Sequence, residues 1–427
     1  GGDHGEEIHD GNFCMDGLVY PDRTVHTGLL EYKNVYRPAR VISYDKESGE
    51  LVLHNYLDFD NLKDYVKISY ELTQDGLVIS RGKIPEVSAA PHSEGKTNLK
   101  INVPENGKCY LKLIYHLKKE VPLLDEDHIL GFDEIEVSKD GAKCKLAEKW
   151  LQKTAVDSEL QVNENDTQIH IKGREFAYTI DKRTALFTEM KFAGREYLNH
   201  PMELNIWRAP TDNDMYIKSE WKKAHYDKAY TRAYTTEVVQ GKHGVKITSH
   251  ASVVAETVQK ILDVTITWKI EAAGKIDADI AVTKDDEFPD LPRFGVRMFL
   301  DKKLSAARYF GMGPQESYCD KHQAASHGLY QANVDDLHED YIRPQENGSH
   351  YDCEYVELNN SRYGIVASAE NAFSFNASYY TQEELEKKTH NYELTESDSV
   401  VFCVDYALNG IGSNSCGPVV LEQYRFD

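Results

Sequence analysis

The first group of residues that could do chemistry lies in the stretch 1–23, whose sequence is GGDHGEEIHDGNFCMDGLVYPDR. This stretch mixes glycines, carboxylates and two histidines with a short aromatic and polar turn. Glycines weaken regular structure, and carboxylates favour contact with water or cations. A loop that shapes a site is therefore expected here, rather than an element of the core.

Three further polar segments stand out, and each of them is ambiguous when it is considered alone. RAPTDND at residues 208–214 could hold a cation or hydroxyl groups, but an Asx-rich turn that satisfies its own backbone is the simpler interpretation. GMGPQESY at residues 311–318 carries a carboxylate at Glu316, and GIGSNSCGP at residues 410–418 is typical of a hairpin connection. The sequence has no P-loop, dinucleotide-binding glycine pattern, HExxH or GxSxG motif.

Composition narrows the class of protein. At 427 residues the chain exceeds one hydrophobic core, so two or more domains are expected. A net charge of -22 argues against nucleic acid or an anionic membrane as partner, and no apolar run reaches the roughly 20 residues of a membrane helix. The 7 cysteines are widely spaced without a CxxC pair, which favours a reducing, cytoplasmic location. Because the chain starts Gly-Gly-Asp, we expect it to be part of a longer protein.

The elements that must position these loops are mostly strands. A short helix is expected at residues 28–35, with Thr27 as its N-cap and Pro38 after its end. Seven short strands follow over about 100 residues, which is typical of an immunoglobulin-like sandwich. They are predicted at residues 40–44, 50–56, 66–72, 77–80, 98–103, 108–117 and 129–137.

A charged stretch at residues 138–164 is the expected linker, and a second strand-rich region follows it. This region is too large for one immunoglobulin-like unit, so an extended sandwich of two large sheets is predicted. Helices are expected only at residues 218–229 and 381–388. The predicted strands are residues 168–172, 176–180, 186–192, 261–270, 275–282, 293–300, 364–368, 373–378, 400–408 and 421–426.

Taken in order, the four polar segments resemble the C-terminal part of the glycoside hydrolase family 2 β-galactosidases. The most specific pieces are GGDHGE with NFCMDGLVYPDRTVH, followed by RAPTDND, YFGMGPQESY and GIGSNSCGP. The resemblance implies a mainly β fold in three parts. Residues 1–38 would be the last loop and helix of a catalytic (β/α)8 barrel, residues 39–140 an immunoglobulin-like β-sandwich, and residues 141–427 a β-supersandwich similar to galactose mutarotases.

The implied activity is retaining hydrolysis of terminal β-D-galactosides such as lactose, by one carboxylic acid and one nucleophilic carboxylate. In the family both groups are glutamates of the barrel, upstream of Gly1. No catalytic residue is therefore assigned to this chain, and we expect it to be inactive alone. Upstream catalytic domains or a separate large subunit would complete it, and the full-length protein is expected to be a homo-oligomer.

The resemblance also implies metal sites. A sodium ion beside the galactose 6-hydroxyl would be bound by the backbone carbonyl of Phe13 and the side chain of Asp16, and both are hard oxygen ligands. Asp16 could instead only cap the turn before Gly17. His9 corresponds to an asparagine associated with magnesium in a relative, and imidazole is a poor magnesium ligand. Most magnesium ligands would lie in the missing barrel region.

Cys416 stands where the family often has a tryptophan that stacks on the aglycone sugar. Cysteine cannot stack, so altered aglycone preference is the hypothesis for this substrate-binding position. Two other functions stay open: a stand-alone carbohydrate-binding β-sandwich protein, and a mutarotase-like isomerase. The isomerase needs a histidine base and a glutamic acid in one cleft, with His322 and His350 as candidates.

Overall fold

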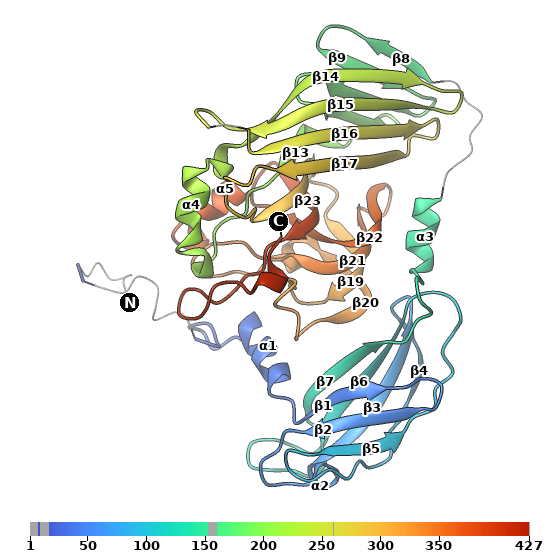
Figure 1. The fold of residues 1–427 in the computed structure, drawn as a ribbon, viewed down its shortest axis with the longest axis vertical. Helices are drawn as coiled ribbons and strands as arrows, with labels where there is room; N and C mark the ends of the chain where they lie inside the picture. Colours follow the sequence, from blue (N-terminus) through green and yellow to red (C-terminus); the bar gives the residue numbers. More distant parts are fainter. Residues whose placement is uncertain (1–6, 9–16, 153–159, 259, 427) are drawn as a thin grey trace.

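The computed structural model describes residues 7–8, 17–152, 160–258 and 260–426. Within these residues the strands form five sheets, and the expected mainly β fold is confirmed. Figure 1 shows two bodies, a smaller one at the bottom that contains β1 to β7 and a larger one above it that contains the later strands. Helix α1 (Thr27–Val35) lies between the smaller body and the central loops of the larger one.

The smaller body is a sandwich of two antiparallel sheets, with strand orders β1-β2-β5 and β4-β3-β6-β7. On β6 the residues at every second position from Cys109 to Leu117 are buried, because alternate side chains of a strand point to the same face. Helix α2 (Leu62–Tyr65) precedes β3. The strands are β1 (Ala39–Tyr44), β2 (Glu50–Asn55), β3 (Val66–Gln74), β4 (Leu77–Lys83), β5 (Glu94–Asn98), β6 (Cys109–Leu117) and β7 (Ile129–Glu136).

One predicted strand of this body is wrong. Residues 98–103 were expected to be extended and paired, but β5 ends at Asn98 and the following residues form no strand. β5 instead pairs with β2 through residues 94–98, which contain two charged side chains and a glycine and carry no apolar alternation. Gly95 is required there because a Cβ would lie 2.7 Å from the carbonyl oxygen of Ser88.

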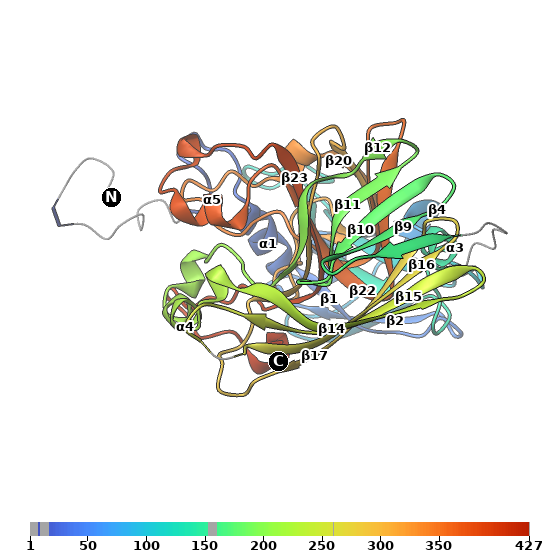
Figure 2. The same cartoon turned by 90° about the horizontal axis from the view of Figure 1, so that it is seen from above.

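The larger body contains sheets with strand orders β12-β11-β10-β9-β8, β14-β15-β16-β17 and β13-β18-β23-β22-β21-β19-β20. In Figure 2 the sheet that contains β14 and β17 and the sheet that contains β9 to β11 lie beside the seven-stranded sheet that contains β22 and β23. Helix α3 (Lys145–Leu151) lies in the predicted linker and joins the two bodies. Helices α4 (Ile217–Lys223) and α5 (Gln382–Lys387) lie at one end.

The strand bounds of the larger body are as follows: β8 (Gln161–Glu164), β9 (Gln168–Lys172), β10 (Phe176–Asp181), β11 (Leu186–Phe192), β12 (Arg195–Glu196), β13 (Leu198–Asn205), β14 (Tyr230–Gln240), β15 (Gly244–Val254), β16 (Leu262–Glu271), β17 (Ile276–Lys284), β18 (Arg293–Asp301), β19 (Ala306–Gly313), β20 (Ser326–Asn333), β21 (His350–Asn359), β22 (Gly364–Ser378) and β23 (Ser399–Leu408).

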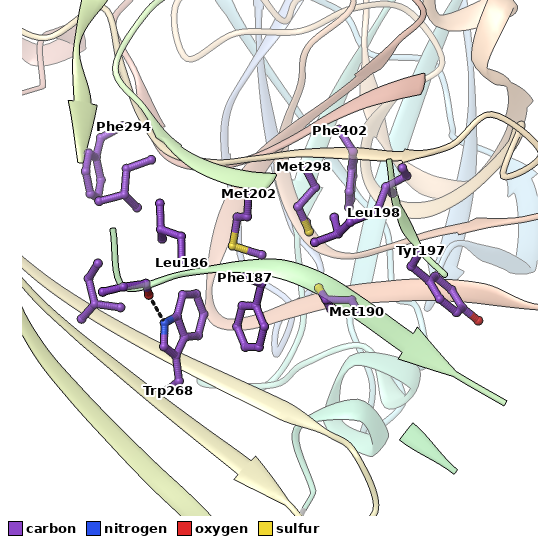
Figure 3. Packing of buried hydrophobic residues seen from close by; sticks show 14 of the residues in the cluster. Leu186, Phe187, Met190, Tyr197, Leu198, Met202, Trp268, Phe294, Met298 and Phe402 are labelled. Atoms are coloured by element: carbon purple, nitrogen blue, oxygen red, sulfur yellow. Dashed lines mark hydrogen bonds between the residues drawn. The ribbon is translucent and has the colours of Figure 1, made fainter. Parts of the chain in front are cut away.

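One hydrophobic core runs between these sheets, and Figure 3 shows part of it around Trp268. The Trp268 ring packs edge-on against Phe187 with centroids 4.9 Å apart, and its indole N–H donates to the carbonyl of Ala185 at 2.8 Å. A buried tryptophan needs such a partner for its polar edge. Alternating apolar residues on β16 supply this face, as the sequence pattern predicted.

Several sequence predictions for this body need correction. Residues 421–426 form no strand but a 3-10 turn at Glu422–Tyr424, and the two strands expected at 364–368 and 373–378 are the single strand β22. The strands that were not predicted are β8, β12, β13, β14, β15, β19, β20 and β21. Thr- and Tyr-rich segments such as β14 have no clear apolar alternation, so pairing with β15 rather than burial makes them strands.

Thr27 was expected to cap α1, but it is the first helical residue and His26 is the N-cap.

No helix in the described part of the chain is long and apolar enough to cross a membrane.

Candidate functional site

The loop that follows β13 is fastened by a buried arginine. The Arg208 guanidinium makes two hydrogen bonds to Asp214, at 3.1 and 2.7 Å, so that the loop closes on itself. The same guanidinium donates to the carbonyls of Asn409 at 2.7 Å and Gly410 at 3.1 Å. Arg208 therefore connects two of the polar segments singled out in the sequence, residues 208–214 and 410–418.

A second set of contacts joins these loops to the one after β19. The Asn213 amide donates to the carbonyl of Gly412 at 2.8 Å, and Ser415 Oγ donates to Asn213 Oδ1 at 2.8 Å. Asp320, just after the segment 311–318, accepts from the backbone N–H groups of Ile411 and Gly412 at 2.9 and 2.8 Å. Three loops that are far apart in the sequence thus form one surface.

Glu316 lies beneath this surface rather than open to it. The residue is 6% exposed, and its carboxylate accepts from Lys321 Nζ at 2.5 Å, from the N–H of Gly348 at 2.8 Å and from the Tyr341 hydroxyl. Burial alone would favour the neutral acid, but Lys321 and these hydrogen bonds hold the pKa of Glu316 below its usual value. The carboxylate anchors the loop and is not free to act as an acid.

The described end of the opening stretch lies against the same loops. The Tyr20 hydroxyl donates to Glu339, and the His26 ring lies between Tyr20 and Tyr341, with ring centroids 4.6 and 5.1 Å away. Thr27 Oγ1 lies 3.3 Å from Glu316 Oε1. Residues 17–27 therefore extend the loop surface. The predicted ligands His9, Phe13 and Asp16 lie outside the described residues.

Helix α1 is bound to the rest of the chain by its polar side. Glu31 accepts from the backbone N–H groups of Gln323 and Ala324, both at 2.8 Å. Asn34 donates to the carbonyl of Gln323 at 2.8 Å and accepts from the N–H of Phe132 at 2.7 Å. The helix thereby contacts both bodies of the molecule.

His327 on β20 joins the two bodies beside this helix. Nδ1 lies 2.6 Å from Glu134 on β7, and Nε2 lies 2.9 Å from Asp352 on β21. The ring stacks on Tyr110 of β6 with centroids 4.2 Å apart. Although burial lowers its pKa, the bonds to Asp352 and Glu134 raise the pKa of His327 to about 9, so the ring is an imidazolium at neutral pH. We call the contacts of Glu31, Asn34, Glu134, His327 and Asp352 the seam.

Cys416 is exposed in a tight turn whose N–H groups at Cys416 and Gly417 donate to the carbonyl of Ser413. The histidines considered for isomerase chemistry do not form a base and acid pair in an open cleft. His350 is 1% exposed, packed between Tyr309 and Phe375, and burial lowers its pKa to about 4. His322 instead packs against Tyr351.

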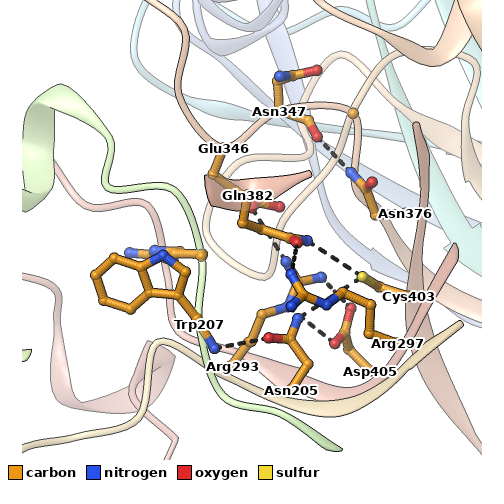
Figure 4. Close-up of polar contacts among 12 residues, drawn as sticks. Asn205, Trp207, Arg293, Arg297, Glu346, Asn347, Asn376, Gln382, Cys403 and Asp405 are labelled. Atoms are coloured by element: carbon orange, nitrogen blue, oxygen red, sulfur yellow. Dashed lines mark hydrogen bonds and ion pairs between the residues drawn. The ribbon is translucent and has the colours of Figure 1, made fainter. Parts of the chain in front are cut away.

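A cluster of buried charges next to this surface was missed by the sequence analysis (Figure 4). Arg293 on β18 bonds to Asp405 on the neighbouring strand β23 at 3.1 and 2.5 Å, and to Glu346 at 3.2 Å. We call Arg208, Asp214, Arg293, Glu346 and Asp405 the arginine cluster. The sequence did contain a signal for this cluster. Arginines at 293 and 297 interrupt an otherwise apolar strand, and a charged residue in a buried strand is rare unless it is paired.

Burial governs the charges of this cluster. It raises the pKa values of Glu346 and Asp405, while the nearby arginines act in the opposite direction. Glu346 Oε1 has no hydrogen-bond partner in the described part of the chain. Two guanidinium groups and three carboxylates therefore share one enclosed space, which holds the ends of β13, β18 and β23 together beneath the loops.

The described residues hold no group of three or more His, Cys, Asp or Glu side chains placed to bind a metal ion. The loop surface offers amides, hydroxyls and backbone groups, while its carboxylates at Asp214, Glu316 and Asp320 are already bonded within the protein. Such a surface can position a polar ligand.

Family models match the chain in three consecutive parts. Residues 172–427 match the β-galactosidase small chain, residues 51–138 match β-galactosidase domain 4, and residues 1–41 match the TIM barrel domain of glycosyl hydrolases family 2. The chain therefore belongs to the β-galactosidase small chain family, and the resemblance identified from its loop motifs is confirmed.

Curated relatives extend this assignment. Over 427 residues the chain is 45% identical to the β-galactosidase of Actinobacillus pleuropneumoniae, covering 100% of this chain and 41% of that protein. It is 33% identical to the β-galactosidase of Staphylococcus xylosus, with 100% of this chain and 42% of the relative covered. The chain thus spans about two fifths of the length of these relatives.

Proposed function

We propose that this chain is the C-terminal part of a retaining β-galactosidase that hydrolyses terminal β-D-galactosides such as lactose. Its role is to supply one wall of the sugar site and the scaffold behind it. The division proposed is a barrel tail at residues 1–38, an immunoglobulin-like sandwich at 39–140 and a supersandwich at 141–427. The catalytic acid and nucleophile are two glutamates upstream of Gly1, which protonate the leaving oxygen and attack the anomeric carbon.

The observation that carries this proposal is the orientation of α1. Its polar residues Thr27, Glu31 and Asn34 face this chain. Tyr32 on the opposite side of the helix and Tyr36 at its C-cap are 47% and 69% exposed. An amphipathic helix normally buries its apolar side. The outward stripe therefore needs a partner, and the remainder of a barrel that precedes α1 is the partner we propose.

Two sets of assays test the proposal. The 427-residue chain alone is expected to show no turnover of a chromogenic β-galactoside, because it lacks the catalytic pair. Mixing it with the preceding part of the Actinobacillus pleuropneumoniae relative is expected to produce turnover. The double variant Tyr32→Asp/Tyr36→Asp should abolish this complementation, whereas Tyr234→Asp, at a tyrosine that is 57% exposed on β14, should not. Turnover by the chain alone, or complementation that survives the double variant, contradicts the proposal.

The donor set also supports a monovalent cation site in the opening loop. The carbonyl of Phe13 and the carboxylate of Asp16 would hold sodium, which is a hard cation that prefers oxygen, beside a sugar hydroxyl. The imidazole of His9 does not fit magnesium, so no magnesium role is assigned to it. In the whole protein, Asp16→Ala is expected to remove the difference in melting temperature between equal concentrations of sodium and potassium.

Cys416 is proposed as an aglycone-side residue, because its exposed turn is bonded to the loop surface through Ser415 and Asn213. Without an aromatic ring, the enzyme should bind glucose weakly as an acceptor. Cys416→Trp in the full-length protein is expected to tighten glucose binding, measured as acceptor inhibition at fixed galactoside. Cys416→Ser is the control, and an unchanged affinity in the tryptophan variant contradicts the assignment. We also propose that the full-length enzyme is a homo-oligomer and is located in the cytoplasm.

A further inference from the structure

An open hollow of about 510 Å³ lies where three turns of the larger body meet, away from the loop surface described above. Its lining residues are Arg195, Lys303, Asn360, Arg362 and Tyr363. Arg195 follows the turn between β11 and β12, Lys303 lies between β18 and β19, and the other three lie between β21 and β22. Each of the three turns therefore contributes one cation to the lining of the hollow, namely Arg195, Lys303 and Arg362.

The three cations of the hollow run against the overall charge of the chain, which is -22. In the part of the chain that the structure describes, Arg195, Lys303 and Arg362 form no ion pair with a carboxylate. The nearby carboxylate of Asp301 already accepts from the Tyr363 hydroxyl at 3.1 Å and from the backbone N–H of Lys303 at 3.1 Å. The lining of the hollow therefore carries three cations and no carboxylate, and Asp301 behind it offsets only part of their charge.

One of the cations is held in place by aromatic packing. The Arg195 guanidinium lies 4.6 Å from the centre of the Tyr363 ring, and Tyr363 packs edge-on against Tyr197 with centroids 5.7 Å apart. Stacking of this kind orients the guanidinium without consuming its N–H donors. The bond to Asp301 and the contact with Tyr197 position the tyrosine, and the Tyr363 ring in turn holds the Arg195 guanidinium beside the hollow.

We propose that this hollow binds the phosphate group of a small phosphorylated metabolite of the sugar phosphate class. Guanidinium groups match phosphate oxygens with paired hydrogen bonds, and an ammonium group adds a point charge. The hollow is larger than one phosphate ion, so a sugar attached to the phosphate can contact Asn360 and Tyr363. The site requires nothing from the proposed hydrolytic reaction.

Direct binding at constant ionic strength tests this proposal. Inorganic phosphate and glucose 6-phosphate are titrated into the full chain, and binding is followed by broadening of the phosphorus NMR line and by calorimetry. Arg195→Ala and Arg362→Ala are each expected to weaken binding at least tenfold, as expected for loss of a charge-assisted hydrogen bond. Arg195→Lys should recover part of the affinity, since it keeps the charge but not the paired donors.

Arg232 provides the matched control, because it is also an arginine beside a tyrosine, 5.7 Å from the ring centre of Tyr234, but on the distant strand β14. Arg232→Ala is expected to leave binding unchanged. Equal binding of the two probes supports a site for free phosphate, and tighter binding of glucose 6-phosphate supports the sugar phosphate. No saturable binding, equal displacement by chloride, or equal weakening by Arg232→Ala overturns the proposal.

Discussion

The arginine cluster and the seam both bury charge, yet they join different parts of the chain. In the arginine cluster, Arg293 and Asp405 lie on adjacent strands of one sheet and are both fully buried. In the seam, His327 connects β20 of the larger body to Glu134 on β7 of the smaller one. The first closes a sheet beneath the loop surface, whereas the second sets how the two bodies sit relative to each other.

This difference predicts different consequences when each is broken. A lost partner in the arginine cluster leaves carboxylates enclosed without a counter-charge, so the large sandwich itself should weaken. A lost partner in the seam leaves carboxylates that can reach water once the bodies separate, because Asp352 is already 40% exposed. The seam should therefore be the weaker of the two, and its loss should uncouple the bodies rather than unfold either.

Arg293→Met is expected to have the largest effect, because it strands Asp405 and Glu346 in a closed space. We expect a loss of about 4 kcal/mol in the free energy of unfolding, the range seen when one partner of a buried pair is removed. Urea unfolding followed by tryptophan fluorescence measures it. Arg232→Met, at an exposed position, is the control and should change stability little. A loss below about 1 kcal/mol would show that the cluster is already partly neutral.

His327→Gln is expected to cost about 2 kcal/mol, because charge-assisted bonds to Glu134 and Asp352 are lost together. The diagnostic result is a split of one unfolding transition into two, one for each body, in calorimetry. His92→Gln removes an exposed pair with Asp58 and serves as the control, with no split expected. A single transition of unchanged midpoint in the His327 variant contradicts a coupling role.

The seam should also respond to pH. The folded protein holds the pKa of His327 at about 9, above the ordinary value of 6.5, so its stabilisation is complete below pH 6.5 and is lost as the pH rises through about 9. Chemical unfolding between pH 6.5 and 9.5 should show the loss. The His327→Gln variant should show a smaller decline over this range, and equal declines in both proteins would exclude His327 as the source.

Thr27→Val is expected to give the smallest effect. Its hydroxyl lies 3.3 Å from Glu316, 3.2 Å from Lys321 and 3.2 Å from Tyr341, so the contacts of one buried hydroxyl are lost without a change of shape. We expect a loss of about 1 kcal/mol in stability. Thr24→Val, on the exposed turn with Asp22, is the matched control. If both variants lose the same stability, α1 is not held by this contact.

Much of the fold could be predicted locally. The alternation on β6 and β16 and the turn signals between strands identified most elements of the smaller body, because side-chain burial follows the period of a strand. The prediction failed at β14 and β20, where polar residues are held in strands by their neighbours. It also failed at residues 421–426, where apolar residues at the end of the chain join no sheet.

For the functional surface, the sequence by itself determined the family through its loop motifs, and it singled out Phe13, Asp16 and Cys416 as proposed site residues. Only the tertiary structure decided that the loops at 208–214, 311–318 and 410–418 meet, and that Arg208 and Asp320 join them. It also placed Glu316 in the interior and left the apolar side of α1 exposed. The physical reason is that motifs depend on local residue order, whereas buried charge pairs such as Arg293 and Asp405, which are 112 residues apart in sequence, depend on how strands are paired.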